Sequence, residues 1–197
     1  LRGTFFQQIG PFDRFVRDPI KKTVIDTIRY GSGEKVQTYR NLEPRLTVRY
    51  AVNNSSSIKA AYTQNYQYIH LASLSGVSLP TDVWIPSSDK VKPQFATQYA
   101  LGYFKNFKNN TYESSVELYY KEMKNQVEYE EGYLPENSIN DNIDNNFVYG
   151  DGWSYGAEFF IKKAKGKFNG WIGYTLAWTK RKFPDLNRGL TFSPKYD

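Results

Sequence analysis

The sequence contains no cysteine and a single histidine, His70. Without cysteine the chain has no disulfide framework, no thiol nucleophile and no cysteine-based zinc site. One histidine also excludes a metal centre built from several imidazoles. Long apolar runs are missing as well: no stretch approaches the ~18 consecutive apolar residues of a membrane-spanning helix. A helical membrane protein is therefore excluded.

Aromatic side chains, by contrast, are abundant. Tyr, Phe and Trp make up 17% of the 197 residues, although hydrophobic residues as a whole reach only 40%. The net charge of +6 is spread along the chain and not gathered in blocks, so we expect no nucleic-acid partner. A tyrosine-rich chain that is polar on average suits either a soluble all-β domain or a membrane β-barrel, whose apolar residues are diluted by alternation.

Apolar and polar residues alternate with a period of two in several segments, which is the pattern of β-strands. In residues 42–52, for example, Leu46 and Val48 share one face, and Thr47 and Arg49 share the other. Turn residues such as Asn, Gly, Pro and Ser separate these segments. The predicted strands cover residues 3–9, 42–52, 57–69, 94–107, 111–129, 152–163 and 167–181.

The predicted connections fall into a short set and a long set. Short turns are expected at 53–56, 108–110 and 163–166, and long loops at 10–41, 70–93, 130–150 and 182–190. Outer-membrane barrels have short turns at one end and long loops at the other, whereas a β-sandwich scatters its loop lengths over both ends. The pattern favours a transmembrane barrel over a soluble domain. Residues expected to contact lipid are Leu46, Val48, Leu101, Val116, Leu118, Phe159, Ile172 and Leu176.

A set of short segments carries a resemblance to a known family. They are Asn41-Leu42-Glu43-Pro44-Arg45-Leu46, Tyr99-Ala100-Leu101-Gly102-Tyr103, Glu117-Leu118-Tyr119-Tyr120-Lys121, Gly152-Trp153-Ser154-Tyr155-Gly156-Ala157-Glu158, Gly170-Trp171-Ile172-Gly173-Tyr174-Thr175-Leu176 and Pro194-Lys195-Tyr196-Asp197. In order and spacing they resemble the barrel of TonB-dependent outer-membrane receptors, especially the type common in Bacteroidota. The resemblance covers most of residues 40–197. It implies an all-β, antiparallel transmembrane β-barrel of about 22 strands, of which residues 1–197 are a fragment.

The resemblance also implies a function, a location and partners. We expect a receptor in the outer membrane of a Gram-negative cell that binds a nutrient and imports it with energy from TonB. The expected partners are outer-membrane lipid and lipopolysaccharide, TonB through an absent N-terminal region, and a surface lipoprotein or other outer-membrane subunits. The plug domain and the terminal strands are expected outside this sequence. The alternative is a plugless barrel that serves as a structural or assembly subunit of an outer-membrane complex.

Candidate ligand-binding residues are expected at the rim of the outer loops. Trp84 lies between Pro80 and Pro86 in the long 70–93 loop. Tyr68 lies near the outer end of the preceding strand, and His70 follows that strand. Proline limits the entropy that a loop loses when it orders around a ligand. The alternative for Trp84 is packing against neighbouring loops.

Carboxylates are the remaining candidates for chemistry. Those in and beside the 130–150 loop lack the alternating spacing of a calcium loop, so a solvated acidic loop without a bound metal is expected. Glu113 and Glu117 lie roughly 13 Å apart along one strand face, too far apart for paired-carboxylate hydrolysis. No nucleophile motif is present. The sequence therefore predicts no enzyme, no catalytic residue and no cofactor. The acidic residues in and beside the 130–150 loop are Glu128, Glu130, Glu131, Glu136, Asp141, Asp144 and Asp151.

Overall fold

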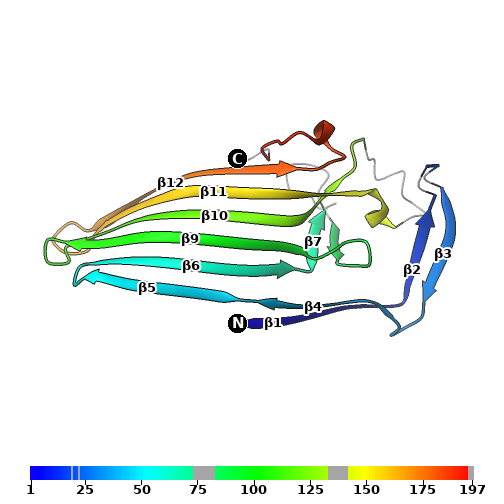
Figure 1. Ribbon diagram of the computed structural model, residues 1–197, viewed down its shortest axis with the longest axis horizontal. Helices are drawn as coiled ribbons and strands as arrows, with labels where there is room; N and C mark the ends of the chain where they lie inside the picture. The colour runs from blue at the N-terminus through cyan, green and yellow to red at the C-terminus, as the bar shows by residue number, and fades with distance from the viewer. Residues whose placement is uncertain (19, 22, 73–82, 133–141, 195–197) are drawn as a thin grey trace.

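The computed structural model describes residues 1–18, 20–21, 23–72, 83–132 and 142–194. Long antiparallel strands run side by side through most of the molecule (Figure 1). The elements are β1 (Arg2–Ile9), β2 (Phe12–Arg17), β3 (Val24–Tyr30), β4 (Lys35–Glu43), β5 (Arg45–Asn53), β6 (Ser56–Gln67), β7 (Ile69–Ala72), β8 (Val83–Pro86), β9 (Gln94–Phe107), β10 (Tyr112–Tyr129), η2 (Ile143–Asn146), β11 (Phe147–Lys163), β12 (Gly170–Lys182) and η3 (Asn187–Gly189). None of the helices in these ranges is long and apolar enough to cross a membrane.

The main sheet has six strands in the order β12–β11–β10–β9–β6–β5. β1 pairs with β4, and β4 leads into β5 across Pro44. The short turns β5–β6, β9–β10 and β11–β12 gather at one end of the sheet, which we call the short-turn end (Figure 1). The hairpin β2–β3 and the paired strands β7 and β8 lie at the other end, called the loop end, together with residues 87–93, 142–146 and 183–190 (Figure 1). The antiparallel all-β architecture and the separation of short from long connections confirm the sequence prediction.

Two of the predicted long loops contain additional strands, and a third, 130–150, overlaps β11, which begins at Phe147. Residues 10–41 contain the hairpin β2–β3 and strand β4, and residues 70–93 contain the paired strands β7 and β8. β4 escaped prediction because its sequence, Lys35 to Glu43, is mostly polar and lacks clean alternation. β2 and β7 have only six and four residues, too few to display a period. The predicted 57–69 strand also breaks at Tyr68, between β6 and β7.

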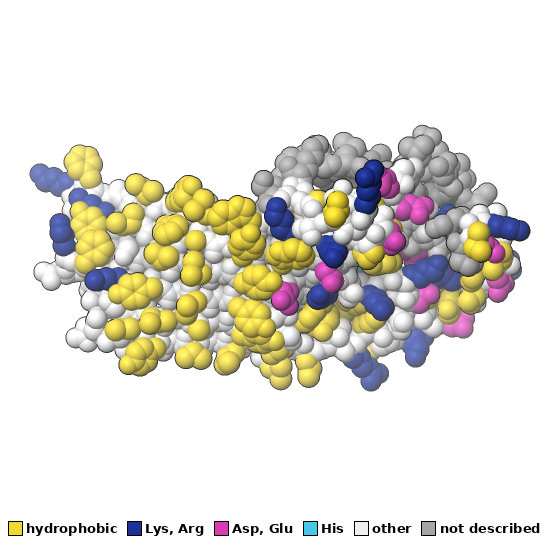
Figure 2. All heavy atoms as spheres, turned by 45° about the horizontal axis from the view of Figure 1, so that its top comes forward, with side chains coloured by type: hydrophobic (Ala, Val, Ile, Leu, Met, Phe, Trp, Pro, Cys, Tyr) yellow, Lys and Arg dark blue, Asp and Glu magenta, His cyan; other side chains and the backbone are white. Residues whose placement is uncertain are grey.

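Strand register places the predicted lipid-contact residues on one face. Val48, Ala60, Leu101, Leu118, Ala157 and Leu176 oppose one another in a continuous row across the sheet. The next row on this face toward the loop end has Leu46 on β5 and is aromatic on the other five strands: Tyr62, Tyr99, Tyr120, Tyr155 and Trp178. Rings of this kind sit at the headgroup level of a bilayer. Figure 2 shows the apolar band, with lysine and arginine beyond it at one end and charges of both signs at the other.

The sheet has no apolar core of its own. Among the described residues, the buried hydrophobic side chains are Ile85, Val91, Phe147, Val148 and Phe183, and all of them lie at the loop end. On the apolar face, Leu101 is 53% exposed and Ile172 is 71% exposed. A single layer with one exposed apolar face and one polar face is what the wall of a membrane barrel requires, because lipid covers the first and the lumen the second.

Adjacent residues on β12 test this assignment of faces. Leu176 belongs to the apolar row, whereas Thr175 opposes Glu158 on the polar face. We expect Leu176→Arg to destabilise the full-length protein in lipid bilayers by ~2–4 kcal/mol, because arginine near the midplane is costly on the lipid face. Thr175→Arg should cost much less. Denaturant unfolding in bilayers compares the two, and equal costs would contradict the register-based faces.

Candidate functional site at the loop end

A buried ion pair joins segments far apart in the chain at the loop end. Arg14 on β2 donates from one guanidinium nitrogen to both carboxylate oxygens of Asp144 in η2, at 2.8 and 2.7 Å. Its second nitrogen donates to Asp89, and Ser88 Oγ donates to Asp144 at 3.0 Å. Arg14 is only 2% exposed and Asp144 7%. Burying charges is tolerated only when they are paired and hydrogen-bonded in this way.

Asparagine side chains extend this connection by pairing with the β2 backbone. The Phe15 N–H donates to Asn142 Oδ1 at 2.6 Å, and Asn142 Nδ2 donates to the Asp13 carbonyl at 2.8 Å. Asn145 Nδ2 donates to the Phe15 carbonyl at 3.1 Å. These amides therefore satisfy one edge of β2 as a neighbouring strand would. We call Arg14, Ser88, Asp89, Asn142, Asp144 and Asn145 the loop clamp.

A small apolar cluster lies next to the loop clamp. Ile85, Val91 and Phe147 form its buried centre, and the partly buried side chains packed against them include Tyr149 and Ile143. Burial raises the pKa of the Tyr149 phenol, and the negative charge of Asp144 acts in the same direction. The loop clamp therefore ties Asp89 and residues 142–145 to β2, and the cluster packs Ile85 and Val91 against Phe147.

The predicted ligand-binding residues occupy different surroundings. Trp84 on β8 is 65% exposed and opposes Leu71 across the hairpin, so the described residues do not bury its ring. Tyr68 stacks on Phe6 with ring centroids 5.2 Å apart, and its hydroxyl accepts a hydrogen bond from Asn41 Nδ2 at 2.9 Å. Of the two, Trp84 is the more accessible to a ligand.

His70 is buried at the loop end. It is 3% exposed, and its Nε2 lies 2.9 Å from Ser87 Oγ. Burial lowers the pKa of its imidazole to about 4, so the ring is neutral at physiological pH. The described residues therefore shield His70 from solvent, and ligand binding by this residue stays a prediction.

Three of the acidic residues around the β10–β11 connection are paired with cations, which differs from the expectation of a solvated acidic loop. Asp144 binds Arg14, Glu128 pairs with Arg181, and the Asp151 carboxylate lies 2.7 Å from Lys124 Nζ. Burial raises the pKa of Glu128, while the Arg181 charge opposes that rise. Glu136 and Asp141 lie outside the described residues. Within the described ranges, no group of three His, Asp or Glu side chains is placed to hold a metal ion.

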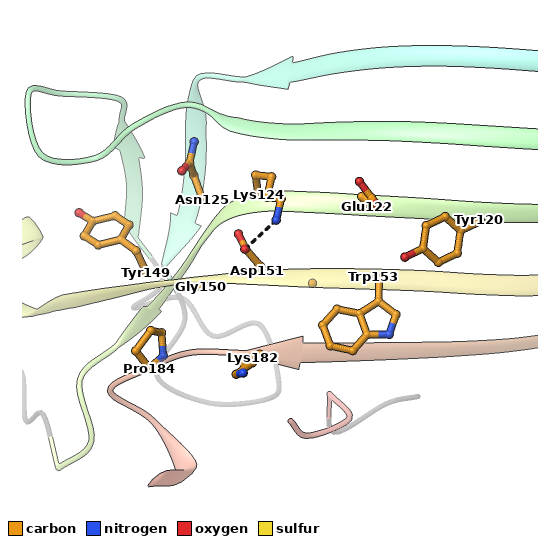
Figure 3. A pocket seen from close by; sticks show the side chains of 11 residues that line it. Tyr120, Glu122, Lys124, Asn125, Tyr149, Gly150, Asp151, Trp153, Lys182 and Pro184 are labelled. Carbon is orange, nitrogen blue, oxygen red and sulfur yellow. Dashed lines mark hydrogen bonds and ion pairs between the residues drawn. The ribbon is translucent and has the colours of Figure 1, made fainter. Parts of the chain in front are cut away.

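A hollow of about 470 Å³ opens beside the aromatic row on β10, β11 and β12. Tyr120, Glu122, Lys124, Asp151, Trp153 and Lys182 line it and share the apolar face of the sheet by register. Figure 3 shows Lys124 directed at Asp151, and the Trp153 ring over the space between β11 and β12. This hollow cannot be recognised in the sequence, because its lining residues come together only through cross-strand register.

Comparison with known proteins agrees with this geometry. The family described as TonB dependent receptor-like, beta-barrel, matches residues 12–196. A chain in the solved structure of the FpvAI–pyocin S2 complex has a similar fold over 85% of the present chain, with a TM-score of 0.50 and 19% sequence identity. The match covers 20% of that chain, so the present chain spans about a fifth of its length. No match was found among curated protein sequences.

The chain therefore belongs to the TonB-dependent receptor-like β-barrel family. Its antiparallel sheet is part of the wall of a transmembrane barrel in the outer membrane of a Gram-negative cell. This confirms the family, fold class and location predicted from the sequence.

The loop clamp yields a prediction about the stability of the loop end. Arg14→Ala leaves Asp144 buried without its cation, which typically costs ~3–5 kcal/mol. We expect the outer connections of the full-length protein to become sensitive to added protease while the barrel keeps its resistance to heat and detergent. Arg29→Ala, an exposed arginine on neighbouring β3, is the matched control. Equal protease resistance of both variants would show that the clamp does not hold the loops.

Proposed function

We propose that the full-length protein captures a ligand at the loop end and imports it across the outer membrane with energy delivered by TonB. The observation that carries this proposal is family membership over residues 12–196. The folded loop end supports it, because loops that are held in place before binding lose less conformational entropy when a ligand binds. The exposed Trp84 is the candidate contact on that surface.

We also propose that a plug domain, outside this sequence, occupies the lumen. Charges on the polar face support this part of the proposal. Arg49 opposes Lys59 directly, and Glu117 opposes Glu158 in the same row. Like charges in directly opposed positions destabilise a sheet, and none of these side chains has an ion-pair partner in the described part of the chain. A folded plug surface with complementary charges would offset that repulsion.

Uptake assays test the transport proposal. A strain that makes the full-length receptor is offered a panel of iron chelates, glycans and peptides, with and without TonB. We expect uptake of at least one of these compounds to require both the receptor and TonB. Receptor-dependent uptake that is unchanged without TonB, or no receptor-dependent uptake across the panel, would contradict the proposal.

Trp84→Ala tests capture at the loop end. We expect it to lower ligand binding and uptake by about tenfold or more at normal surface levels, because removing a large aromatic contact typically costs 2 kcal/mol or more at a binding hot spot. Phe168→Ala is the control, since Phe168 is 83% exposed at the short-turn end. Unchanged uptake in Trp84→Ala would remove Trp84 from the site.

A further inference from the structure

The hairpin β2–β3 has one strand edge that the rest of the described chain leaves open. Its sheet contains only β2 and β3. The Phe15 N–H donates to Asn142 and the Phe15 carbonyl accepts from Asn145, so both backbone groups of Phe15 point away from β3. Phe15 is paired with Thr27. In an antiparallel pair, a residue whose backbone groups point outward faces a residue whose groups also point outward. The backbone groups of Thr27 therefore lie on the free edge of β3.

Arg29 contributes the second pair of edge groups. It is paired with Asp13, whose carbonyl accepts from Asn142 and therefore also points away from β3. Of the four outward groups, the Thr27 N–H donates to the Asp26 carboxylate at 2.7 Å. The Thr27 carbonyl and both backbone groups of Arg29 make no hydrogen bond within the described ranges. Thr27 and Arg29 are roughly 7 Å apart along the strand, so the edge repeats a donor and an acceptor at the spacing of an extended polypeptide.

The free edge lies where a ligand from outside would meet the protein. β3 lies outside β2, at the end of the molecule opposite the short-turn end (Figure 1). The other edge of the hairpin is held by Asn142 and Asn145 of the loop clamp, so β3 rests on a support that is ordered before a ligand binds. This order lowers the entropy cost of binding. Ile28, which is 45% exposed, adds an apolar contact surface beside the edge.

We propose that the ligand captured at the loop end is a short peptide, which binds in extended form by adding a strand to β3 at Thr27 and Arg29. This inference rests on the proposed capture function and names its substrate class. Recognition by the edge requires N–H and carbonyl groups that alternate along an extended chain, an alternation that glycans do not have. On binding, a peptide carbonyl replaces the Asp26 carboxylate as the acceptor for the Thr27 N–H.

The length of the edge selects a peptide over a second folded protein. Only Thr27 and Arg29 offer outward backbone pairs, because the register shifts at the Arg17 end of the hairpin. A stable complex between two proteins buries roughly 1,200–2,000 Å², which is far more than two strand residues supply. A short extended peptide needs no larger surface.

The first test uses the purified full-length receptor, immobilised in detergent and exposed to a tryptic digest of casein. Retained peptides are quantified by mass spectrometry. We expect the unmodified receptor to retain peptides and Thr27→Pro to retain about tenfold less, because proline lacks the N–H that donates to the ligand. Proline is tolerated at this position, since the Thr27 N–H lies outside the β2–β3 ladder. Thr27→Val keeps the N–H and is the matched control. Equal resistance of both variants to added protease would show that the hairpin is intact.

The second test detects main-chain recognition by its period. The peptide retained most strongly is synthesised with N-methyl groups on either its odd-numbered or its even-numbered residues. Alternate N–H groups of a strand point to opposite edges, so one form should bind about tenfold more weakly and the other as the unmethylated peptide does. Equal effects of the two methylation patterns, equal retention by Thr27→Pro and Thr27→Val, or no peptide retention by the unmodified receptor would overturn the proposal.

These binding assays contain no TonB and are therefore separate from the test of transport. TonB-dependent uptake of another compound by a receptor that retains no peptide would overturn peptide capture alone. Peptide binding with the expected period, combined with uptake that does not need TonB, would contradict the transport proposal and leave peptide capture standing.

Discussion

The bilayer interior offers no hydrogen-bond partner to a peptide group, and this constraint governs the structure. The strands of the main sheet satisfy this constraint by pairing their peptide groups in one antiparallel sheet, in the order β12–β11–β10–β9–β6–β5. Because side chains alternate along every strand, a ladder in continuous register carries each face from one strand to the next. The apolar row through Val48, Leu101, Leu118 and Leu176 and the aromatic row beyond it both follow from that register.

The loop end follows a different physical rule. Water is present there, so irregular backbone can be satisfied by side chains and need not form a ladder. Asn142 and Asn145 supply donors and acceptors to the β2 edge, and Arg14 and Asp144 supply a charge pair shielded from solvent. The result is a set of connections packed around their own apolar cluster, while the sheet below packs against lipid. A ligand can then be recognised by the folded surface of the loop end, while strand pairing in the main sheet fixes the shape of the barrel wall independently.

Periodicity made the long strands predictable. Residues 94–107 were predicted as a strand and form β9, and residues 111–129 correspond to β10 within one residue. Periodicity could not identify strands whose sequences are short or mostly polar, such as β2 and β4. The loop clamp could not be predicted, because Arg14 and Asp144 are separated by 130 residues and neither sits in a recognisable motif. The hollow needed the register of β10, β11 and β12, which the sequence alone does not provide. Trp84 was predicted at the loop end and is exposed there, although its contact with a ligand remains a prediction.

The orientation of the sheet in the membrane is the central claim, and accessibility to a membrane-impermeant maleimide in intact cells tests it most directly. This chain has no native cysteine. In a cysteine-free full-length background, single cysteines replace Thr23 or Asp185 at the loop end, and Asn54 or Lys165 at the short-turn end; all of these residues are exposed. The account predicts labelling of the first pair in intact cells and of the second pair only after the outer membrane is permeabilised. The reverse pattern, or labelling of both ends in intact cells, would contradict it.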